Sequence, residues 1–426
     1  MTIPVPGQIL GPTATPRVSW AEDAALQPLV AASVFPLLAG SAHSLAYLDS
    51  AASAQKPAVV LDRLRRFYET GYANIHRGVY PLSETATEDY EAARERVARF
   101  LNADTAEIVF TRSATEAINL VANSYGGQFL KPGDAILVSM LEHHANIVPW
   151  QMLRDRLGLQ LRVAPIDAQG DIDLDAFRRE LDRGVKLVAV TAIANTIGTV
   201  NPMSELIRLS HLAGAKVLVD AAQAAPHRAI DVKALDCDFL AFTGHKVYGP
   251  DGIGVLFGKA DLLDAMPPWQ GGGDMIRSVS FERTVYAESP RRFEAGTPPI
   301  GAAIGLATAL GFIAGIGFDR VAAHDRALSA YAIAQLEGIP GLRIVGRPRD
   351  RAGIVSMTLD GLHPHDVGTL LGAAGICVRT GHHCAQPLME HLGLTGTIRA
   401  SLAVHTGQGD IDLLATELAK ARQVLT

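Results

Sequence analysis

Short apolar segments alternate with longer amphipathic segments through the middle of this 426-residue chain, and this alternation limits the fold more than any other feature. Residues 203–213 illustrate the longer kind, because their apolar positions recur at close to helical spacing. The expected strands are 107–111, 135–140, 159–166, 186–193, 216–220, 237–243 and 253–258. Strands and helices that alternate in this way predict an α/β fold, with a largely parallel sheet covered on both faces.

The pattern changes after residue 318. A helix is followed by short expected strands and further helices, which is typical of a smaller α+β unit. The expected strands of this unit are 342–346, 353–359, 376–380 and 398–404. We therefore expect three parts: an N-terminal arm over 1–44 that packs with the small domain, a large domain over 45–300 and a small C-terminal domain over 301–426.

Charge and apolar content exclude some classes of protein. The net charge is −6, so the chain lacks the basic excess that drives binding to nucleic acid. The N-terminus has no basic region before an apolar run, so no signal peptide is expected. The uncharged segment 300–318 is rich in Gly and Ala and lacks flanking aromatic or basic anchors. We expect it to be a buried core helix and not a membrane span.

Three cysteines, Cys237, Cys377 and Cys384, are too few for a disulfide framework, which favours a reducing compartment and a cytoplasmic protein. Cys237 and Cys377 lie inside expected strands, so both are expected to be core residues. Cys384 lies in an expected loop with Arg379, and such cationic neighbours favour a reactive thiolate. A zinc site made of 382–384 is the alternative, but contiguous side chains diverge, and we expect no metal.

In open α/β sheets, sites form where strands end at their carboxyl edge. Lys246 follows the expected strand 237–243 among glycines, although a surface lysine is the plain alternative. Asp220 ends the strand 216–220, with Gln223 three residues later. A buried carboxylate there needs a partner, such as the protonated ring nitrogen of pyridoxal phosphate (PLP), or else Asp220 caps a helix.

Two further strands are followed by polar groups. Residues 113–116 (SATE) open a helix after 107–111, which suits either a phosphate or an ordinary helix start. His143 follows 135–140, where it would stack on a flat ring or be a hydrogen-bonded core histidine. Asn195 follows 186–193 and is another polar group at the same expected edge.

The order of these motifs resembles the class V aminotransferase branch of the fold-type I PLP enzymes. The segment RTGHHCA makes the chain similar to group II (SufS-type) cysteine desulfurases. The resemblance extends from about residue 47 to near the C-terminus and includes YLDSAASAQKP, HRGVYPLS, EHHANIVPWQ, DAAQ, GHKVYGP, GGGDMI and RFEAGTP. It implies a large domain with a mainly parallel seven-stranded sheet and a smaller C-terminal α+β domain.

The resemblance also implies how the cofactor is held. Lys246 would bind PLP covalently and later move protons, Asp220 would pair with the ring nitrogen, Gln223 would contact the ring hydroxyl, and His143 would stack on the ring. Thr297 would reach the phosphate of a neighbouring subunit, which implies a homodimer. The residues placed at the phosphate by the resemblance are Ala114, Thr115, Thr243 and His245.

Substrate residues and function are implied in the same way. Arg399 would clamp the substrate carboxylate, with Asn195 and Arg379 assisting, and His76 and Arg77 would line the site. The implied reaction converts L-cysteine to L-alanine and leaves a persulfide on Cys384. The sulfur would pass to an acceptor protein of SufE or SufU type for iron–sulfur cluster assembly.

Other functions stay open at this point. A selenocysteine lyase or cysteine sulfinate desulfinase would use the same site. A class V transaminase or a kynureninase-like hydrolase would not need Cys384, and a non-catalytic scaffold would not need Lys246 and Asp220. The chain departs from the family pattern at Thr243, at Ala114 and over 405–412, and its first 20 residues match nothing that we can assign.

Overall fold

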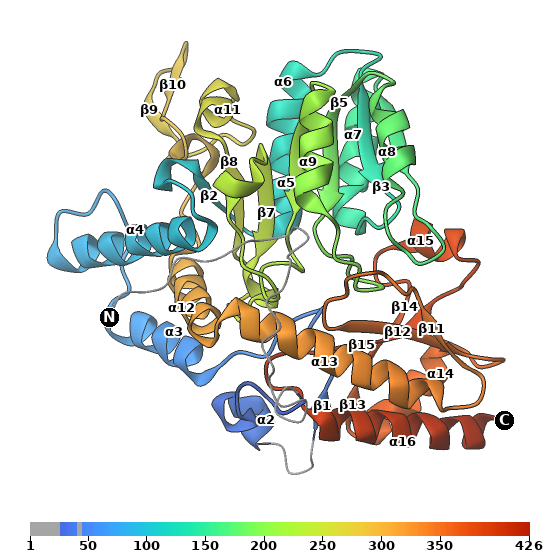
Figure 1. The fold of residues 1–426 in the computed structure, drawn as a ribbon. Helices are drawn as coiled ribbons and strands as arrows, with labels where there is room; N and C mark the ends of the chain where they lie inside the picture. Colours follow the sequence, from blue (N-terminus) through green and yellow to red (C-terminus); the bar gives the residue numbers. More distant parts are fainter. Residues whose placement is uncertain (1–25, 41–44) are drawn as a thin grey trace.

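A seven-stranded sheet forms the centre of the molecule, of which the computed structural model describes residues 26–40 and 45–426 (Figure 1). The strands run in the order β2-β8-β7-β6-β5-β3-β4, and only β8 is antiparallel to its neighbours. Their bounds are β2 (Ile108–Thr111), β3 (Ala135–Ser139), β4 (Gln160–Ala164), β5 (Val185–Thr191), β6 (Lys216–Asp220), β7 (Phe239–Thr243) and β8 (Gly254–Gly258). This confirms the predicted α/β class and the mainly parallel sheet.

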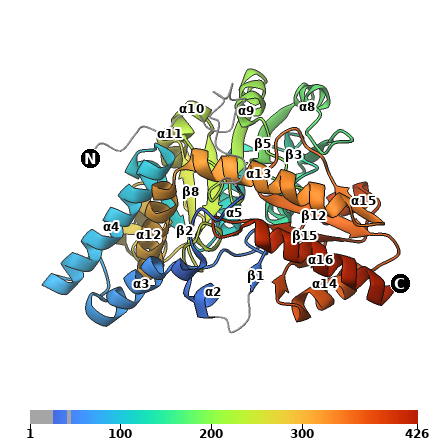
Figure 2. The ribbon, with the colours of Figure 1, turned by 60° about the horizontal axis from the view of Figure 1, so that its bottom comes forward.

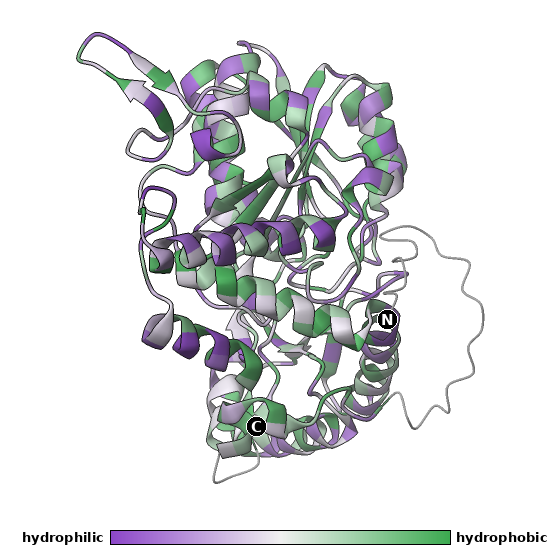
Figure 3. Cartoon of the chain, turned by 90° about the vertical axis from the view of Figure 1, so that its left-hand side faces the viewer, coloured by the Kyte–Doolittle hydropathy of each residue, from purple (hydrophilic) through white to green (hydrophobic). Residues whose placement is uncertain are grey.

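Apart from the edge strand β4, which is only partly buried, the sheet is buried on both faces, and this explains why the other strands have mostly apolar sequences. In β8, for example, Val255 and Phe257 belong to one core, while Leu256 between them belongs to the other. The first core includes α3 (Ala58–Thr70), α4 (Pro81–Leu101), α8 (Leu174–Leu181), α9 (Met203–Leu212), α10 (Val232–Leu235) and α12 (Ile300–Ile316). The second includes α5 (Ala114–Val121), the π-helical η3 (Ala122–Gly126), α7 (Val148–Leu157) and α11 (Ala260–Ala265), with α6 (Gly127–Phe129) following η3. Figure 3 shows hydrophobic residues concentrated on the strands between these helices.

A second, antiparallel sheet lies in the C-terminal part of the chain (Figure 2). Its order is β11 (Leu342–Val345), β12 (Ile354–Leu359), β15 (Thr397–Ser401) and β14 (Arg379–Gly381). A third core joins it to α13 (Phe318–Glu337), α14 (Pro364–Ala373) and α16 (Gln408–Leu425). The short helix α15 (Gln386–His391) follows the loop that contains Cys384.

Residues 26–40 lie against the C-terminal part of the chain. The Val30 N–H donates to the Val404 carbonyl at 2.9 Å, and the Gln408 N–H donates to the Leu26 carbonyl at 2.8 Å. This segment contains η1 (Ala32–Val34) and α2 (Pro36–Gly40). The rest of the predicted arm, 1–25 and 41–44, lies outside the described residues, and the division into an arm and two domains stays a prediction.

A β-hairpin of β9 (Ile276–Val279) and β10 (Thr284–Tyr286) projects from the body of the molecule (Figures 1 and 3). The remaining short helices are four 3-10 turns among the described residues. They are η2 (Thr105–Glu107), η4 (His144–Asn146), η5 (Gly244–Lys246) and η6 (Arg291–Phe293). Of these, η4 begins directly after His143 and η5 ends at Lys246.

Several sequence predictions of regular structure are wrong at their boundaries. The expected strand 376–380 is two strands, because β13 (Ile376–Cys377) pairs with β1 (Ala46–Tyr47) whereas β14 pairs with β15. Cys377 is only half-buried, and the buried Cys237 precedes its strand.

The expected core helix 300–318 ends early. Gly317, at φ +94°, ends α12, and α13 begins at the next residue. Within the described residues no single helix is long and apolar enough to cross a membrane. Among the described residues, only α12 and α13 taken together have the length and apolar composition of a membrane span, and the two helices are bent by 72° relative to each other.

Candidate active site

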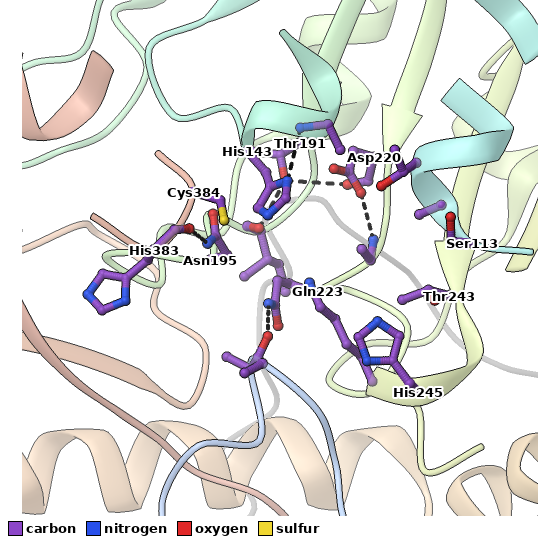
Figure 4. Close-up of a pocket in the computed structure, with 18 of the residues that line it drawn as sticks. Ser113, His143, Thr191, Asn195, Asp220, Gln223, Thr243, His245, His383 and Cys384 are labelled. Atoms are coloured by element: carbon purple, nitrogen blue, oxygen red, sulfur yellow. Dashed lines mark hydrogen bonds between the residues drawn. The ribbon is translucent and has the colours of Figure 1, made fainter. Parts of the chain in front are cut away.

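A cavity of about 220 Å³ lies where the parallel strands end, facing the loop that contains Cys384 (Figure 4). It brings together all of the predicted site residues except three. The predicted residues that line it are Ala114, Thr115, His143, Asn195, Asp220, Gln223, Thr243, His245, Lys246, Arg379, Cys384 and Arg399.

Lys246 ends the turn η5, directly after the buried strand β7. The turn requires glycine at 244, because a Cβ there would lie 2.5 Å from the Ile253 Cγ2 atom and 2.8 Å from the Pro250 carbonyl oxygen. Burial lowers the pKa of Lys246 to about 8, against the opposing effect of Asp220 and with a further lowering by Arg399. An appreciable fraction of the lysine is therefore an uncharged nucleophilic amine near neutral pH.

Asp220 is the last residue of the central strand β6 and is buried. Its Oδ1 accepts a hydrogen bond from the Ala222 N–H at 2.9 Å. Burial raises the pKa of Asp220, although this hydrogen bond and the charge of Lys246 oppose the rise. Gln223 is held one turn further on, where its Nε2 donates to the Ala51 carbonyl at 2.7 Å (Figure 4).

His143 presents a neutral ring to the cavity. Its Nδ1 accepts a hydrogen bond from the Ala145 N–H at 3.0 Å, which places the ring proton on Nε2. Burial lowers the pKa of His143 to about 3, and the neighbouring Lys246 and His144 act in the same direction. An uncharged imidazole held in this way is suited to stack on a flat ring.

One end of the cavity is suited to an anion. The helix α5 begins at Ala114, and the first turn of a helix leaves backbone N–H groups without intrahelical partners. The Ser113 hydroxyl caps this helix by accepting from the Glu116 N–H at 3.1 Å. The neighbouring strand approaches so closely that a Cβ on Gly254 would lie 2.4 Å from the Ser113 carbonyl carbon.

Two arginines and a carboxylate form the opposite end. Arg379 on β14 and Arg399 on β15 are directly paired across the antiparallel strands, where like charges destabilise each other. Asp49 lies between them: its Oδ2 is 3.2 Å from Arg379 Nη2, and its Oδ1 is 3.3 Å from Arg399 Nη2. Asp49 therefore orders both guanidinium groups.

Arg399 is buried, and Arg379 is exposed. The Arg399 Nη1 donates to the Asn195 carbonyl at 2.9 Å. Burial lowers the pKa of Arg399 to about 10, while Asp49 opposes this effect, so the side chain stays cationic at neutral pH. The Asn195 side chain in turn donates to the His383 carbonyl at 2.7 Å, which ties the arginine to the loop that contains Cys384.

The cavity walls contain buried polar atoms that have no hydrogen-bond partner among the described residues. They are Gln223 Oε1, Asn195 Oδ1, His383 Nδ1 and Arg399 Nε. A buried polar atom without a partner costs about 1–3 kcal/mol, so such atoms mark places where a ligand's polar groups bind. Together with the anion-binding end, the neutral His143 ring and Asp220, they fit PLP.

Three predicted site residues do not line this cavity. Thr297 is exposed, His76 Nε2 lies 3.0 Å from Glu91 Oε1, and Arg77 Nε lies 3.5 Å from Asp274 Oδ1. The structure of one chain therefore leaves their predicted roles untested. Among the described residues, no group of three or more His, Cys, Asp or Glu side chains is placed to hold a metal ion.

Sequence reasoning missed Asp49, although it lies within the quoted segment YLDSAASAQKP. It also gave no role to Glu142, which is buried beneath the turn that carries His143. Glu142 accepts hydrogen bonds from Ser139, from the Asn146 amide at 2.7 Å and from the Thr191 N–H at 3.0 Å. Only burial could have drawn attention to it, and burial raises its pKa to about 8.

Comparison with known proteins agrees with this geometry. The model of the aminotransferase class-V family matches residues 46–414, which is most of the chain. The chain belongs to this family. PLP is the cofactor of the aminotransferase class-V fold type, and the residues described above fit it.

Several proteins that are similar to this chain are named cysteine desulfurases. The cysteine desulfurase of Dickeya dadantii (strain 3937) is 53% identical over 395 residues, covering 92% of this chain and 96% of the relative. The crystal structure of the cysteine desulfurase CsdA from Escherichia coli, in an S-sulfonic acid form, is 42% identical with a TM-score of 0.86, covering 92% and 98%. A structure of C-DES with glycine covalently linked to its PLP cofactor has a TM-score of 0.77 at 25% identity, covering 91% and 98%.

Proposed function

We propose that this chain is a PLP-dependent cysteine desulfurase that converts L-cysteine to L-alanine and takes the sulfur onto Cys384. One observation carries the proposal: the exposed Cys384 thiol lines the same cavity as Lys246 and Asp220. A transaminase needs the lysine and the carboxylate but has no use for a thiol at this position. The thiol therefore decides between these reactions.

The substrate carboxylate would bind Arg399, whose buried Nε lacks a partner among the described residues. PLP, when bound, delocalises the negative charge that develops at the substrate Cα. The lowered pKa of Lys246 lets its neutral amine take the proton from the substrate Cα. The resulting ammonium group can then return a proton to another atom of the substrate's carbon skeleton.

Cys384 then acts as the nucleophile. Its thiolate forms an S–S bond with the substrate sulfur while the substrate C–S bond breaks. The electron pair of the C–S bond stays with the carbon skeleton, which is protonated and leaves as L-alanine. A persulfide remains on Cys384, and atoms and electrons balance without an added oxidant.

The first experiment measures alanine formation from L-cysteine by the PLP-loaded protein in the presence of a thiol reductant. We expect activity in the wild type and in Cys377→Ala, a matched control that removes a half-buried thiol outside the cavity. Cys384→Ala and Lys246→Ala should be inactive. Wild-type alanine formation by Cys384→Ala would refute the role of this thiol.

The same cavity would accept L-selenocysteine, because selenium replaces only the atom that Cys384 attacks. We propose selenocysteine lyase and cysteine sulfinate desulfinase activities as secondary activities of this site. Cys384→Ala should lose sulfur release from cysteine but keep more of its selenium release, since the C–Se bond is weaker. Equal losses on both substrates would argue against this division.

We propose an acceptor protein of SufE or SufU type, and delivery of the sulfur to iron–sulfur cluster assembly in the cytoplasm. The exposure of Cys384 supports this, because a persulfide there is within reach of an acceptor thiol. All three cysteines are free, which suits a reducing compartment. Adding either acceptor type to the purified enzyme and measuring the turnover number would identify the one that is used.

A homodimer is the proposed assembly. The loops of Thr297 and Arg77 both contact the segment 273–274: the Gly296 N–H donates to the Gly273 carbonyl at 3.0 Å, and Arg77 pairs with Asp274. Exposed apolar side chains occur nearby on α3 and the following loop, including Tyr68, Tyr72 and Val79. These features suit a surface that contributes to a second copy's cavity, and light scattering would give the mass.

A further inference from the structure

We propose that His144 is a positioning residue that holds the Cys384 loop in the conformation needed for attack on the substrate sulfur. This inference rests on the proposed role of Cys384. His144 lies next to His143, the residue expected to stack on PLP, in the turn η4, which follows the strand β3 at the carboxyl ends of the parallel strands. It therefore joins the PLP side of the cavity to the nucleophile side.

The Cys384 segment is bound to His144 at two points. The His144 backbone N–H donates to the Cys384 carbonyl at 2.7 Å. Two residues further on, the Gln386 N–H donates to His144 Nε2 at 3.0 Å. The His144 ring also lies against that of His382, with ring centroids 5.5 Å apart and planes inclined by 35°.

The loop needs such support because its backbone is in an uncommon conformation. His383 and Cys384 have φ values of +53° and +56°, in the left-handed region that residues other than glycine rarely adopt. The His382 Nδ1 accepts from the Cys384 N–H at 3.1 Å, so both sides of the Cys384 residue are hydrogen-bonded. Released from these bonds, the loop would relax to commoner backbone conformations and misplace the thiol.

The hydrogen bond from Gln386 requires an unprotonated Nε2 on His144. Burial lowers the pKa of His144, and the neighbouring His382 acts in the same direction. The lone pair of His144 Nε2 is therefore available at neutral pH to accept this hydrogen bond. A different side chain that places an acceptor atom at the same position should be able to replace His144.

The test compares three substitutions that all keep the backbone N–H. His144→Ala removes the acceptor, His144→Gln places an amide oxygen near the Nε2 position, and His144→Asn reaches only the Nδ1 position. We expect kcat for alanine formation to fall about tenfold in the Ala and Asn variants, with KM within about twofold of wild type. The Gln variant should recover most of kcat.

Hydrogen exchange measures the loop directly. In the Ala and Asn variants, the peptide that contains 384–388 should exchange its amide hydrogens about tenfold faster, while peptides from β6 and β7 stay unchanged. His391→Ala, at the exposed end of α15, is the control and should alter neither kcat nor exchange.

Wild-type kcat and exchange in His144→Ala would overturn the proposal, as would equal behaviour of the Gln and Asn variants. If the wild type forms no alanine, the proposed function fails by itself. The exchange comparison still decides then whether His144 holds the loop. If His144→Ala does not fold, the Gln and Asn pair gives the same decision.

Discussion

The two walls of the cavity are built differently. On the wall formed by the large sheet, Asp220 is the last residue of a buried strand and Lys246 ends the turn that follows another. A core on each face of the sheet fixes their positions. On the opposite wall, the exposed Cys384 lies in a loop with a left-handed backbone. Hydrogen bonds with His144, His382 and Asn195 hold this loop in place.

This difference matches the two tasks of a desulfurase. PLP must stay in one orientation, which a rigid strand end provides. The sulfur must be taken up and then handed to an acceptor, which requires an exposed thiol. A rigid wall and a held loop therefore predict different consequences of substitution: large losses of kcat on the sheet side and, apart from the nucleophile Cys384 itself, graded effects on the loop side.

After the complete loss expected for Lys246→Ala, the largest effect within the sheet wall is expected at Asp220. Asp220→Asn keeps an oxygen that can accept from the Ala222 N–H but removes the negative charge that would face the ring nitrogen. We expect kcat for alanine formation to fall roughly 100- to 1000-fold in the PLP-loaded enzyme. Steady-state kinetics at saturating cysteine measures this loss.

Asp410→Asn provides a matched control. Asp410 accepts the Gly407 N–H at 2.8 Å at the start of α16, outside the cavity, and its amide analogue keeps that acceptor. Its kcat should equal that of wild type. Similar losses in both variants would show that the Asp220 effect is not specific to the cavity, and the contrast between the walls would fail.

The second prediction compares two arginines on the other wall. Arg399→Lys loses the planar group that bonds both Asn195 and Asp49, so KM for cysteine should rise about 10- to 100-fold. Arg379→Lys changes an exposed ion pair and should raise KM less than about fivefold. Titration with cysteine at fixed enzyme concentration gives both values. Equal effects would mean that burial does not distinguish these two residues.

The same contrast explains how much could be predicted from the sequence. Most strands of the large sheet were predictable because their segments are almost continuously apolar, although the edge strand β4 (QLRVA) is not. Asp220 and Lys246 stand out as polar residues at strand ends. On the other wall, the break at Val378 could not be predicted, since 379–381 pairs with the nearby strand β15 whereas 376–377 pairs with β1, which is more than 300 positions away. Asp49 was missed for the same reason: its partners are more than 300 positions away.

The last prediction concerns the pH dependence of cofactor uptake by Lys246. Its pKa is lowered from 10.5 to about 8, so between these values the folded protein binds fewer protons than the unfolded chain at this residue. This group therefore makes the folded apoprotein more stable as the pH rises through that window. The neutral amine is the form that bonds to PLP, so the rate of apoprotein reconstitution should rise about tenfold between pH 7 and 9 and then level off. A rise that continues undiminished above pH 9 would show an unperturbed lysine.

Two variants test the charges around Lys246. In Asp220→Asn the midpoint of the pH profile should move below 8, because the negative charge that opposes the lowering of the Lys246 pKa is gone. In Arg399→Lys, which keeps its positive charge, the midpoint should stay in place. The absorbance of the bound cofactor after mixing measures the reconstitution rate of all three proteins. A midpoint in Asp220→Asn equal to that of wild type would show that the charge of Asp220 does not influence the pKa of Lys246.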